Sequence, residues 1–116
     1  MTQRTPTAYH AHIYDANADL DALRRLAEQD LGASGLARVG RLRPAPVGPH
    51  TQPMFQLAFA PEALPTLLPW LLEHRGNRSV LIHPVHGDVR REHEADAMWL
   101  GAPLEIDLSV FGDDAR

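Results

Sequence analysis

Apolar and polar residues alternate along residues 9–14, and this period of two predicts a short β-strand. One face of the strand carries Tyr9, Ala11 and Ile13, and the other carries His10, His12 and Tyr14. The two histidines therefore point to the same side of the predicted sheet. We expect further strands at residues 36–42, 54–59 and 79–83, and a final edge strand at residues 104–108.

Apolar residues at helical spacing predict two amphipathic helices and one short helix. The first runs from Leu20 to Leu31, with Asp19 as the expected N-cap and Gly32 as its end. The second lies within residues 61–76, and Pro65 and Pro69 predict that it is short or kinked. The third is expected within residues 88–97, where Val89, His93 and Ala97 share a face.

The predicted element order up to residue 83 is β-α-β-β-α-β. This order is typical of an α+β fold, the ferredoxin-like sandwich, in which both helices cover one face of an antiparallel sheet. The short helix and the edge strand would then be C-terminal additions. We expect one domain at residues 8–111, with flexible ends at residues 1–7 and 112–116.

Composition narrows the chemistry that this fold could carry. The chain of 116 residues has no cysteine, so any bound metal must be held by nitrogen and oxygen donors. The formal net charge of −4 argues against a nucleic-acid partner. No apolar run approaches the roughly 20 residues that cross a bilayer, and no signal peptide is recognised, so we expect no membrane contact and a cytoplasmic location.

The seven histidines are the strongest candidates for function. His10 and His12 would share the sheet face away from the helices with His83, because the strands that carry them are expected to be neighbours. Imidazole is the commonest metal ligand, so the cluster predicts a divalent metal site. His50, beside a rigid Pro-Val-Gly-Pro loop, and His93 could join it, although His93 could equally be a core histidine bonded to a carbonyl.

Several other polar residues have simpler interpretations. His74 is expected to interact with the C-terminus of a helix, and His86 is expected in a solvated turn. The acidic residues Glu92, Glu94 and Asp96 are expected to form a solvated helix face.

Five strings in this order resemble the DOPA 4,5-dioxygenase family, over about residues 8–111. They are Tyr9-His-Ala-His-Ile-Tyr14, Pro46-Val-Gly-Pro-His50, Ser79-Val-Leu-Ile-His-Pro84, His93 with Ala97-Met-Trp-Leu-Gly101, and Ile106-Asp-Leu-Ser109. The resemblance implies a ferredoxin-like fold that usually dimerises. It also implies extradiol cleavage of a catechol ring with non-haem iron(II) and dioxygen. The sequence departs from the family pattern at His86 and at Leu42-Arg43.

The resemblance matches five histidines to the family's histidine positions: His10, His12, His50, His83 and His93. We hypothesise that His12, His50 and His83 are metal ligands and that His10 and His93 are acid–base catalysts. Glu105 is a weak candidate for a carboxylate ligand. Zinc or another divalent metal would also suit a site of this kind.

Three functions are therefore compared. The first is an iron(II) dioxygenase that cleaves DOPA or a related catechol with O₂, as a homodimer whose second copy covers the histidine face. The second is a non-catalytic dimeric module that binds a metal or a small ligand. In the third, the histidines are structural and the protein is a dimeric scaffold.

Overall fold

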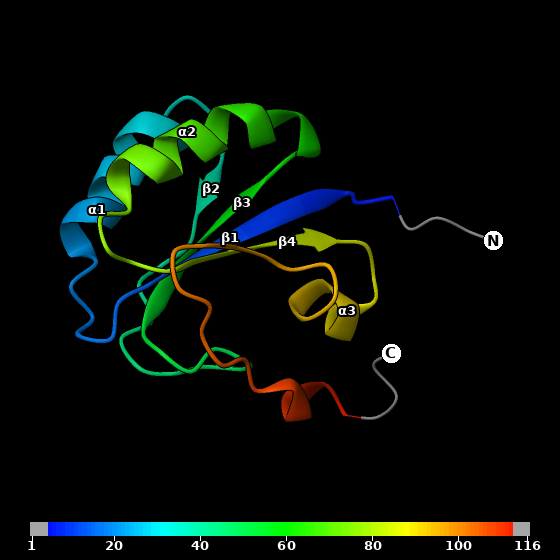
Figure 1. The fold of residues 1–116 in the computed structure, drawn as a ribbon. Helices are drawn as coiled ribbons and strands as arrows, with labels where there is room; N and C mark the ends of the chain where they lie inside the picture. The colour runs from blue at the N-terminus through cyan, green and yellow to red at the C-terminus, as the bar shows by residue number, and fades with distance from the viewer. Residues whose placement is uncertain (1–4, 113–116) are drawn as a thin grey trace.

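The computed structural model describes residues 5–112 as one five-stranded antiparallel sheet with helices on both of its sides (Figure 1). The strand order is β2-β3-β1-β4-β5, so β1 and its histidines lie at the centre of the sheet. Residues 1–4 and 113–116, in the ends predicted to be flexible, lie outside the described residues. The elements are β1 (Ala8–Tyr14), α1 (Asp21–Ala27), the π-helix η1 (Glu28–Gly32), β2 (Arg38–Val39), β3 (Met54–Phe59), the 3₁₀-helix η2 (Pro61–Ala63), α2 (Leu64–His74), β4 (Val80–Val85), α3 (Val89–His93), β5 (Met98–Leu100) and the 3₁₀-helix η3 (Leu108–Phe111).

The main core lies between the sheet and the helices α1 and α2, which share one side of the sheet (Figure 1). The apolar faces predicted for the strands are confirmed, because the ladders align Ile13 with Phe55 and with Val80. The fully or nearly fully buried core includes Ala11, Ile13, Leu23, Phe55, Leu57, Leu67, Leu71, Val80 and Ile82. Period-two alternation then places the histidines of β1 on the opposite face.

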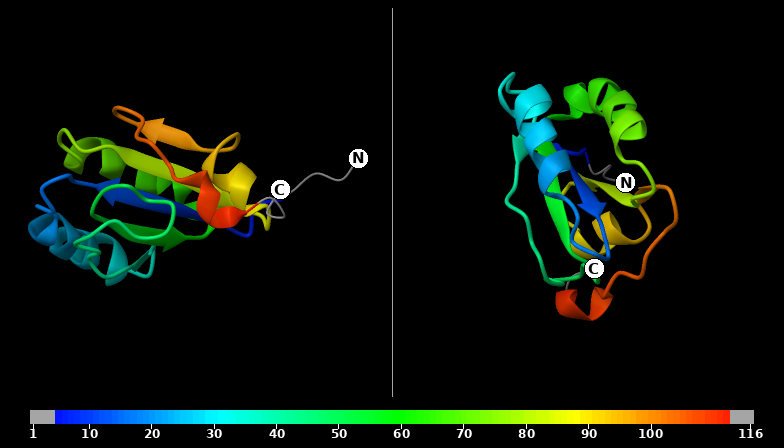
Figure 2. Two further views of the ribbon diagram at one scale, coloured as in Figure 1. Left: turned by 90° about the horizontal axis from the view of Figure 1, so that it is seen from below. Right: turned by 90° about the vertical axis from the view of Figure 1, so that its left-hand side faces the viewer.

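A smaller apolar cluster covers part of that opposite face. Tyr14, Met54 and Leu81 form its buried centre, and Trp99 and Ile106 pack against them. Trp99 is aligned with Leu81 in the β4–β5 ladder, so β5 contributes its tryptophan to this face. The views in Figure 2 show the chain after β5 returning across the sheet toward η3. A segment of the chain itself thus covers part of the face for which a second copy was expected as cover.

The prediction of a C-terminal edge strand at residues 104–108 is wrong in its position. The edge strand is β5 at Met98–Leu100, whereas residues 104–107 run beside the proline-rich connection and make only one isolated bridge, from Ile106 to His50. Prolines in that connection have no N–H to donate, so a regular ladder cannot extend there. Residues 108–111 form η3.

Other boundaries also differ from the prediction. Strand β2 has only two residues, and the first helix has Leu20 at its N-cap with no side-chain cap, so Asp19 does not cap it. Helix α2 accommodates Pro65 in its first turn, where no intrahelical N–H bond is needed, and runs for 11 residues despite Pro69. Helix α3 has only five residues, capped by Asp88, which accepts a hydrogen bond from the Arg91 amide. No helix within residues 5–112 is long and apolar enough to span a membrane.

Candidate metal centre

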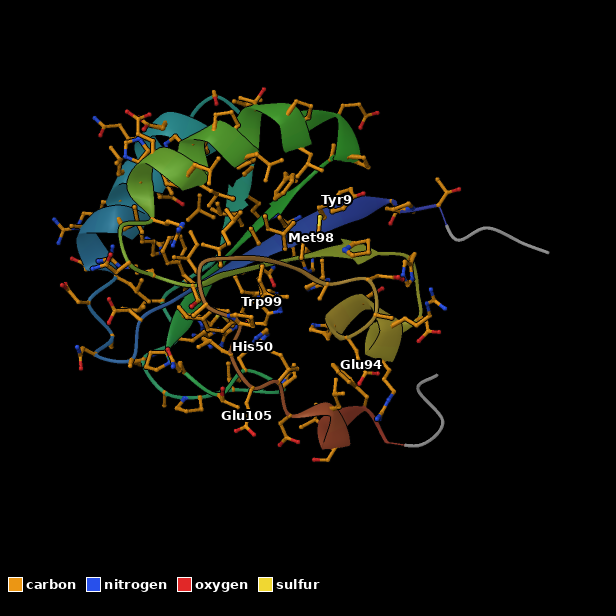
Figure 3. The ribbon with its side chains drawn as sticks, in the orientation of Figure 1. Tyr9, His50, Glu94, Met98, Trp99 and Glu105 are labelled. Carbon is orange, nitrogen blue, oxygen red and sulfur yellow. The ribbon has the colours of Figure 1, made fainter. Side chains whose placement is uncertain are left out.

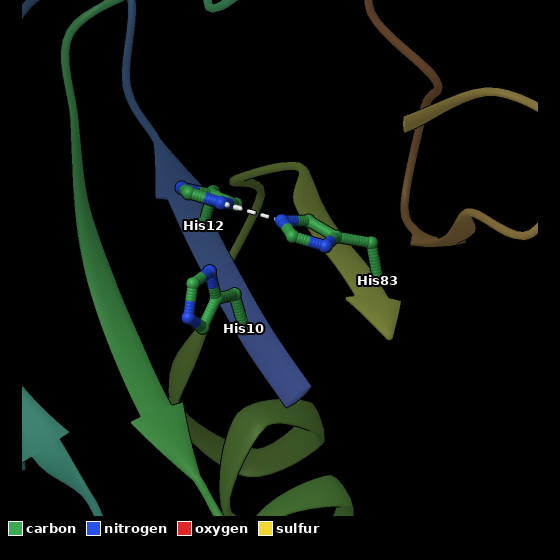
Figure 4. A group of neighbouring side chains, drawn as sticks. All are labelled: His10, His12 and His83. Carbon is green, nitrogen blue, oxygen red and sulfur yellow. Dashed lines mark hydrogen bonds between the residues drawn. The ribbon is translucent and has the colours of Figure 1, made fainter. Parts of the chain in front are cut away.

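Five histidines from four segments meet on the sheet face opposite α1 and α2. His10 and His12 come from β1 and His83 from β4 (Figure 4). His10 and His83 are partners in the ladder between these strands, so their side chains leave the sheet side by side. His93 comes from α3 and His50 from the proline-rich connection. The convergence predicted for these histidines is confirmed.

The imidazoles are in direct contact. The Nε2 atoms of His12 and His83 lie 3.1 Å apart (Figure 4). The ring centres of His12 and His50 are 4.1 Å apart, and those of His83 and His93 are 4.2 Å apart. His10 lies 5.1 Å from His83 by the same measure. A single small ligand or ion could therefore touch several rings at once.

Hydrogen bonds fix which ring nitrogen carries the proton in two of these histidines. His83 Nδ1 lies 2.9 Å from the Pro84 carbonyl oxygen, and His93 Nδ1 lies 2.8 Å from the Val89 carbonyl oxygen. A carbonyl oxygen only accepts, so both Nδ1 atoms must donate an N–H. In the neutral rings, Nε2 then keeps a lone pair. This pattern is typical of metal-ligating histidines, whose second nitrogen donates to a carbonyl or carboxylate.

Burial favours the uncharged form of four of these histidines, His10, His12, His50 and His83. Loss of hydration, reinforced by neighbouring histidines, lowers the pKa of His50 to about 4 and that of His83 to about 3. The pKa of His12 is lowered well below its usual value by burial first and by His50 and His83 next. Burial also lowers the pKa of His10. Neutral imidazoles are the form that binds a metal.

The histidines line a cavity of about 380 Å³, a volume typical of small-molecule sites. Its remaining lining is mainly apolar, with Glu92 as an acidic member. Phe111 forms part of the wall, and its ring centre lies 4.9 Å from that of His93. The complete lining is His10, His12, Pro49, His50, Gln56, His83, Val85, Gly87, Val89, Glu92, His93 and Phe111.

Glu92 is the functional candidate that sequence reasoning missed. It was expected on a solvated helix face, but its side chain is buried, and the residue is only 4% exposed. Its Oε2 accepts hydrogen bonds from the backbone amides of His86 and Gly87, at 2.8 and 2.9 Å. A donor atom of Glu92 lies within 4.8 Å of donor atoms of both His83 and His93. The sequence feature that could have indicated its role is its position next to His93 and after the turn at Gly87.

The donor atoms form three overlapping groups, each compact enough to hold an ion. The groups are His10, His12 and His83; His12, His50 and His93; and His83, Glu92 and His93. His12, His83 and His93 each belong to two of them. Within residues 5–112, the buried His12 Nδ1 has no hydrogen-bond partner, so the polar contacts of His12 are incomplete in this part of the chain. A nitrogen-rich donor set with one carboxylate fits a divalent transition metal.

His50 is held differently from the other histidines. The Tyr14 hydroxyl lies 2.7 Å from His50 Nδ1, and both residues are buried. The His50 amide donates to the Val47 carbonyl, and His50 also bridges to Ile106. Figure 3 shows His50 and Trp99 on the same side of the sheet. The backbone and the ring of His50 are therefore both fixed.

Three other residues considered from the sequence do not line this cavity. Glu105, the weak carboxylate candidate, is exposed and belongs to none of the three donor groups of the described chain (Figure 3). His86 is not solvated as expected, because its side chain is 3% exposed and its Nε2 contacts Asp96 at 2.8 Å. His74 ends α2, where a histidine was expected to interact with the helix C-terminus.

Comparison with known proteins supports a dioxygenase-like protein. A crystal structure from Nostoc punctiforme, of a protein named only provisionally as a dioxygenase, matches with a TM-score of 0.81 at 35% identity and covers 91% of both chains. An uncharacterised 21.2 kDa protein of Botryotinia fuckeliana is 32% identical over 89% of this chain. The DOPA 4,5-dioxygenase of Amanita muscaria is 28% identical over 87% of it.

The chain covers 62% of the Botryotinia protein and 48% of the Amanita enzyme. It therefore spans about half to two thirds of the length of these curated relatives. The model of the Dopa 4,5-dioxygenase family matches residues 9–110, which include all five clustered histidines. The resemblance inferred from the sequence motifs is confirmed, and the chain belongs to the Dopa 4,5-dioxygenase family.

Proposed function

We propose that the protein is a metal-dependent extradiol dioxygenase that opens the ring of a catechol such as DOPA. The observation that carries this proposal is the convergence of five histidines, four with pKa values lowered by burial, and a buried glutamate on one cavity of about 380 Å³. Membership of the family supports the reaction class. The cavity is large enough for a single aromatic ring with a short side chain.

His12 and His83 are the proposed core of the metal site, as expected from the sequence. Two nitrogens on adjacent corners of an octahedral ion, each bonded at about 2.1 Å, lie about 3 Å apart. The separation of 3.1 Å between their Nε2 atoms agrees with that spacing. These two side chains need no large movement to share an ion.

Glu92 and His93 are the proposed remaining ligands. His93 keeps its Nε2 lone pair because Nδ1 donates to the Val89 carbonyl, and Glu92 supplies the carboxylate that is typical of non-haem iron(II) sites. His93 thereby takes the ligand role predicted for His50. His83 links the two halves of the site, since it belongs to one donor group with His12 and to another with Glu92.

Iron(II) is the proposed metal, because zinc could bind the same donors but has no redox chemistry. When bound, iron(II) supplies coordination positions for the catechol oxygens and for dioxygen and allows electron transfer between them. In the overall reaction, one ring C–C bond beside the two hydroxyls breaks. Both atoms of one O₂ molecule are retained in the ring-opened semialdehyde, so no other oxidant is required.

The remaining cavity residues are proposed to deprotonate the catechol and to contact its ring. His10 is half-buried at the cavity and, as predicted from the sequence, is proposed as the base that accepts a proton from a catechol hydroxyl. Its lowered pKa keeps it unprotonated and available at neutral pH. Phe111 and Val89 provide apolar contacts for the ring and exclude water from it.

We propose a ferredoxin-like classification for the sandwich and a homodimer as its assembled state. The residues Val89 and Val110 are 38% and 50% exposed, they belong to the neighbouring segments α3 and η3, and they offer an apolar surface to a second copy. Sedimentation equilibrium at micromolar concentration tests this assembly. A monomer throughout that range would contradict it.

Anaerobic loading with iron(II), followed by air and a panel of catechols that includes L-DOPA, tests the proposed reaction. A yellow ring-opened semialdehyde and oxygen uptake are expected. Tight metal binding without oxygen uptake for any catechol would instead indicate the non-catalytic binding module. Failure to retain any metal would favour structural histidines.

A further inference from the structure

Tyr14 is a buried tyrosine whose hydroxyl faces the histidine cluster rather than water. It is the last residue of β1 and lies on the same face as His10 and His12. Its ring stacks on that of Trp99, with the ring centres 6.0 Å apart. It also packs against Met54 and Leu81 in the smaller apolar cluster. These contacts leave the ring little freedom, so the direction of its hydroxyl is set by the fold.

The hydrogen bond between the Tyr14 hydroxyl and His50 Nδ1 can be formed in two ways. Either the hydroxyl donates to the lone pair of Nδ1, or an Nδ1–H donates to the hydroxyl oxygen. Within residues 5–112, His50 is the hydrogen-bond partner found for this hydroxyl. The second arrangement would therefore leave a buried O–H without an acceptor, which is costly. The first satisfies both groups.

The first arrangement also fixes the tautomer of His50. A ring nitrogen that accepts a hydrogen bond carries no proton, so Nδ1 is the unprotonated nitrogen of the ring. If Nδ1 accepts from Tyr14, the single ring proton must be on Nε2.

We propose that Tyr14 is a positioning residue that holds His50 as the Nε2–H tautomer, so that His50 donates a hydrogen bond to a substrate oxygen in the cavity instead of ligating the metal. His83 and His93 present the opposite tautomer, because their Nδ1 atoms donate to carbonyls. The same cluster thus contains lone pairs for an ion and an N–H for an oxygen atom. The substrate role of His50 rests on the proposed catechol site, whereas its tautomer does not.

Long-range ¹H–¹⁵N correlation spectra of the histidine rings test the tautomer directly, in the metal-free and the zinc-loaded protein. We expect His50 to show a protonated Nε2 and an unprotonated Nδ1, and His83 and His93 to show the reverse. Zinc should shift Nε2 of His83 and leave Nε2 of His50 in place. A protonated Nδ1 in His50, or a zinc-induced shift of its Nε2, would overturn the proposal.

Two substitutions separate positioning from folding. In Tyr14→Phe, the aromatic ring and its packing are kept, and His50 should lose its single tautomer and become a mixture. Tyr9→Phe is the matched control, since Tyr9 lies on the other face of the same strand and packs on Phe59. An unchanged His50 spectrum in Tyr14→Phe would overturn the assignment.

The substrate role is tested with zinc-loaded protein and 4-nitrocatechol, whose absorbance changes on binding to a metal. His50→Leu, which has no side-chain N–H, should retain zinc and bind this catechol about tenfold more weakly, the effect of one lost hydrogen bond. Loss of zinc from His50→Leu would show that His50 is a ligand. Because no oxygen is consumed, these measurements keep their meaning even if the iron-loaded protein cleaves no catechol.

Discussion

The Nε2 atoms of His12 and His83 face each other at 3.1 Å inside the histidine cluster. His83 Nε2 carries a lone pair because its Nδ1 donates to the Pro84 carbonyl, so the proton between the two rings belongs to His12. His12 Nδ1 is then left buried with a lone pair and with no hydrogen-bond partner among the described residues. An ion shared by both Nε2 atoms would require that proton to move to His12 Nδ1. Metal binding should therefore depend on both His12 and His83.

Removal of His83 should abolish tight metal binding. His83→Ala deletes a ligand shared by two donor groups, so we expect zinc or iron(II) affinity to fall by more than the roughly 10–100-fold typical of losing an outer-shell partner. Isothermal titration calorimetry measures this loss. His74→Ala, at the end of α2, is the control and should bind metal normally. Equal affinities in the two variants would contradict a metal on His83.

Neutralising Glu92 should weaken the metal site while leaving the fold intact. In Glu92→Gln, a side-chain oxygen remains to accept from the His86 and Gly87 amides, but the charge is lost. We expect metal affinity to fall by at least the roughly 10–100-fold typical of losing an outer-shell partner and circular dichroism spectra to stay unchanged. The exposed neighbour variant Glu94→Gln should behave like the native protein. Native affinity in Glu92→Gln would exclude this carboxylate as a ligand.

The metal-free protein should lose stability as the pH falls from 7 to 5. Burial lowers the pKa of His50 to about 4, below the value of about 6.5 in an unfolded chain, so the unfolded state binds more protons in this range. His50 alone would contribute a loss on the order of 2 kcal/mol between these pH values.

Urea unfolding at a series of pH values measures this effect. The unfolding midpoint should decrease steadily below pH 6.5, and the decrease should be smaller in His50→Gln, which cannot take up the proton. A midpoint that does not change between pH 7 and pH 5 would show that the cluster is not desolvated as described.

Phe111 should contribute to catechol binding through the cavity wall. Its ring lies beside that of the proposed ligand His93, and Phe111→Ala removes this aromatic contact while leaving every donor atom of the site in place. We expect 4-nitrocatechol to bind the zinc-loaded variant roughly tenfold more weakly, which corresponds to about 1.4 kcal/mol. Val110→Ala, at a half-exposed neighbour, serves as the control. A similar decrease in both variants would argue against a specific role of the Phe111 ring.

The central strand could be predicted from the sequence because residues 9–13 of β1 alternate between apolar and polar side chains. In β1, the period of two separates Ala11 and Ile13 from His10 and His12, and the ladders preserve this separation. The element order was then enough to place His83 beside His10. The five clustered histidines follow from this placement together with the family resemblance.

The C-terminal part of the chain could not be predicted in the same way. Residues 104–108 alternate as well as many strands do, but the neighbouring proline-rich connection allows only one bridge, from Ile106 to His50. Strand β5 has only three residues, too few to show a period. Whether a segment forms a strand depends on the pairing partner that the tertiary structure gives it. Residues 104–108 lack such a partner strand in the described part of the chain, whereas residues 98–100 pair with β4.

Glu92 was missed for a related reason. It stands among the charged residues of α3, and such runs usually lie in solvent. The turn at His86 and Gly87 instead directs two backbone amides at its carboxylate and holds it inside the cavity. The direction of the backbone amides in a turn cannot be predicted from the pattern of polar and apolar residues.

Oxygen incorporation under ¹⁸O₂ measures directly whether the iron-loaded protein is a ring-opening dioxygenase. We expect each cleaved catechol to take up both atoms of one ¹⁸O₂ molecule, detected by mass spectrometry when the semialdehyde is trapped before its aldehyde oxygen exchanges with water. His83→Ala should give no product. Intact catechol after exposure of the iron-loaded protein to ¹⁸O₂, across a panel of catechols, would contradict it.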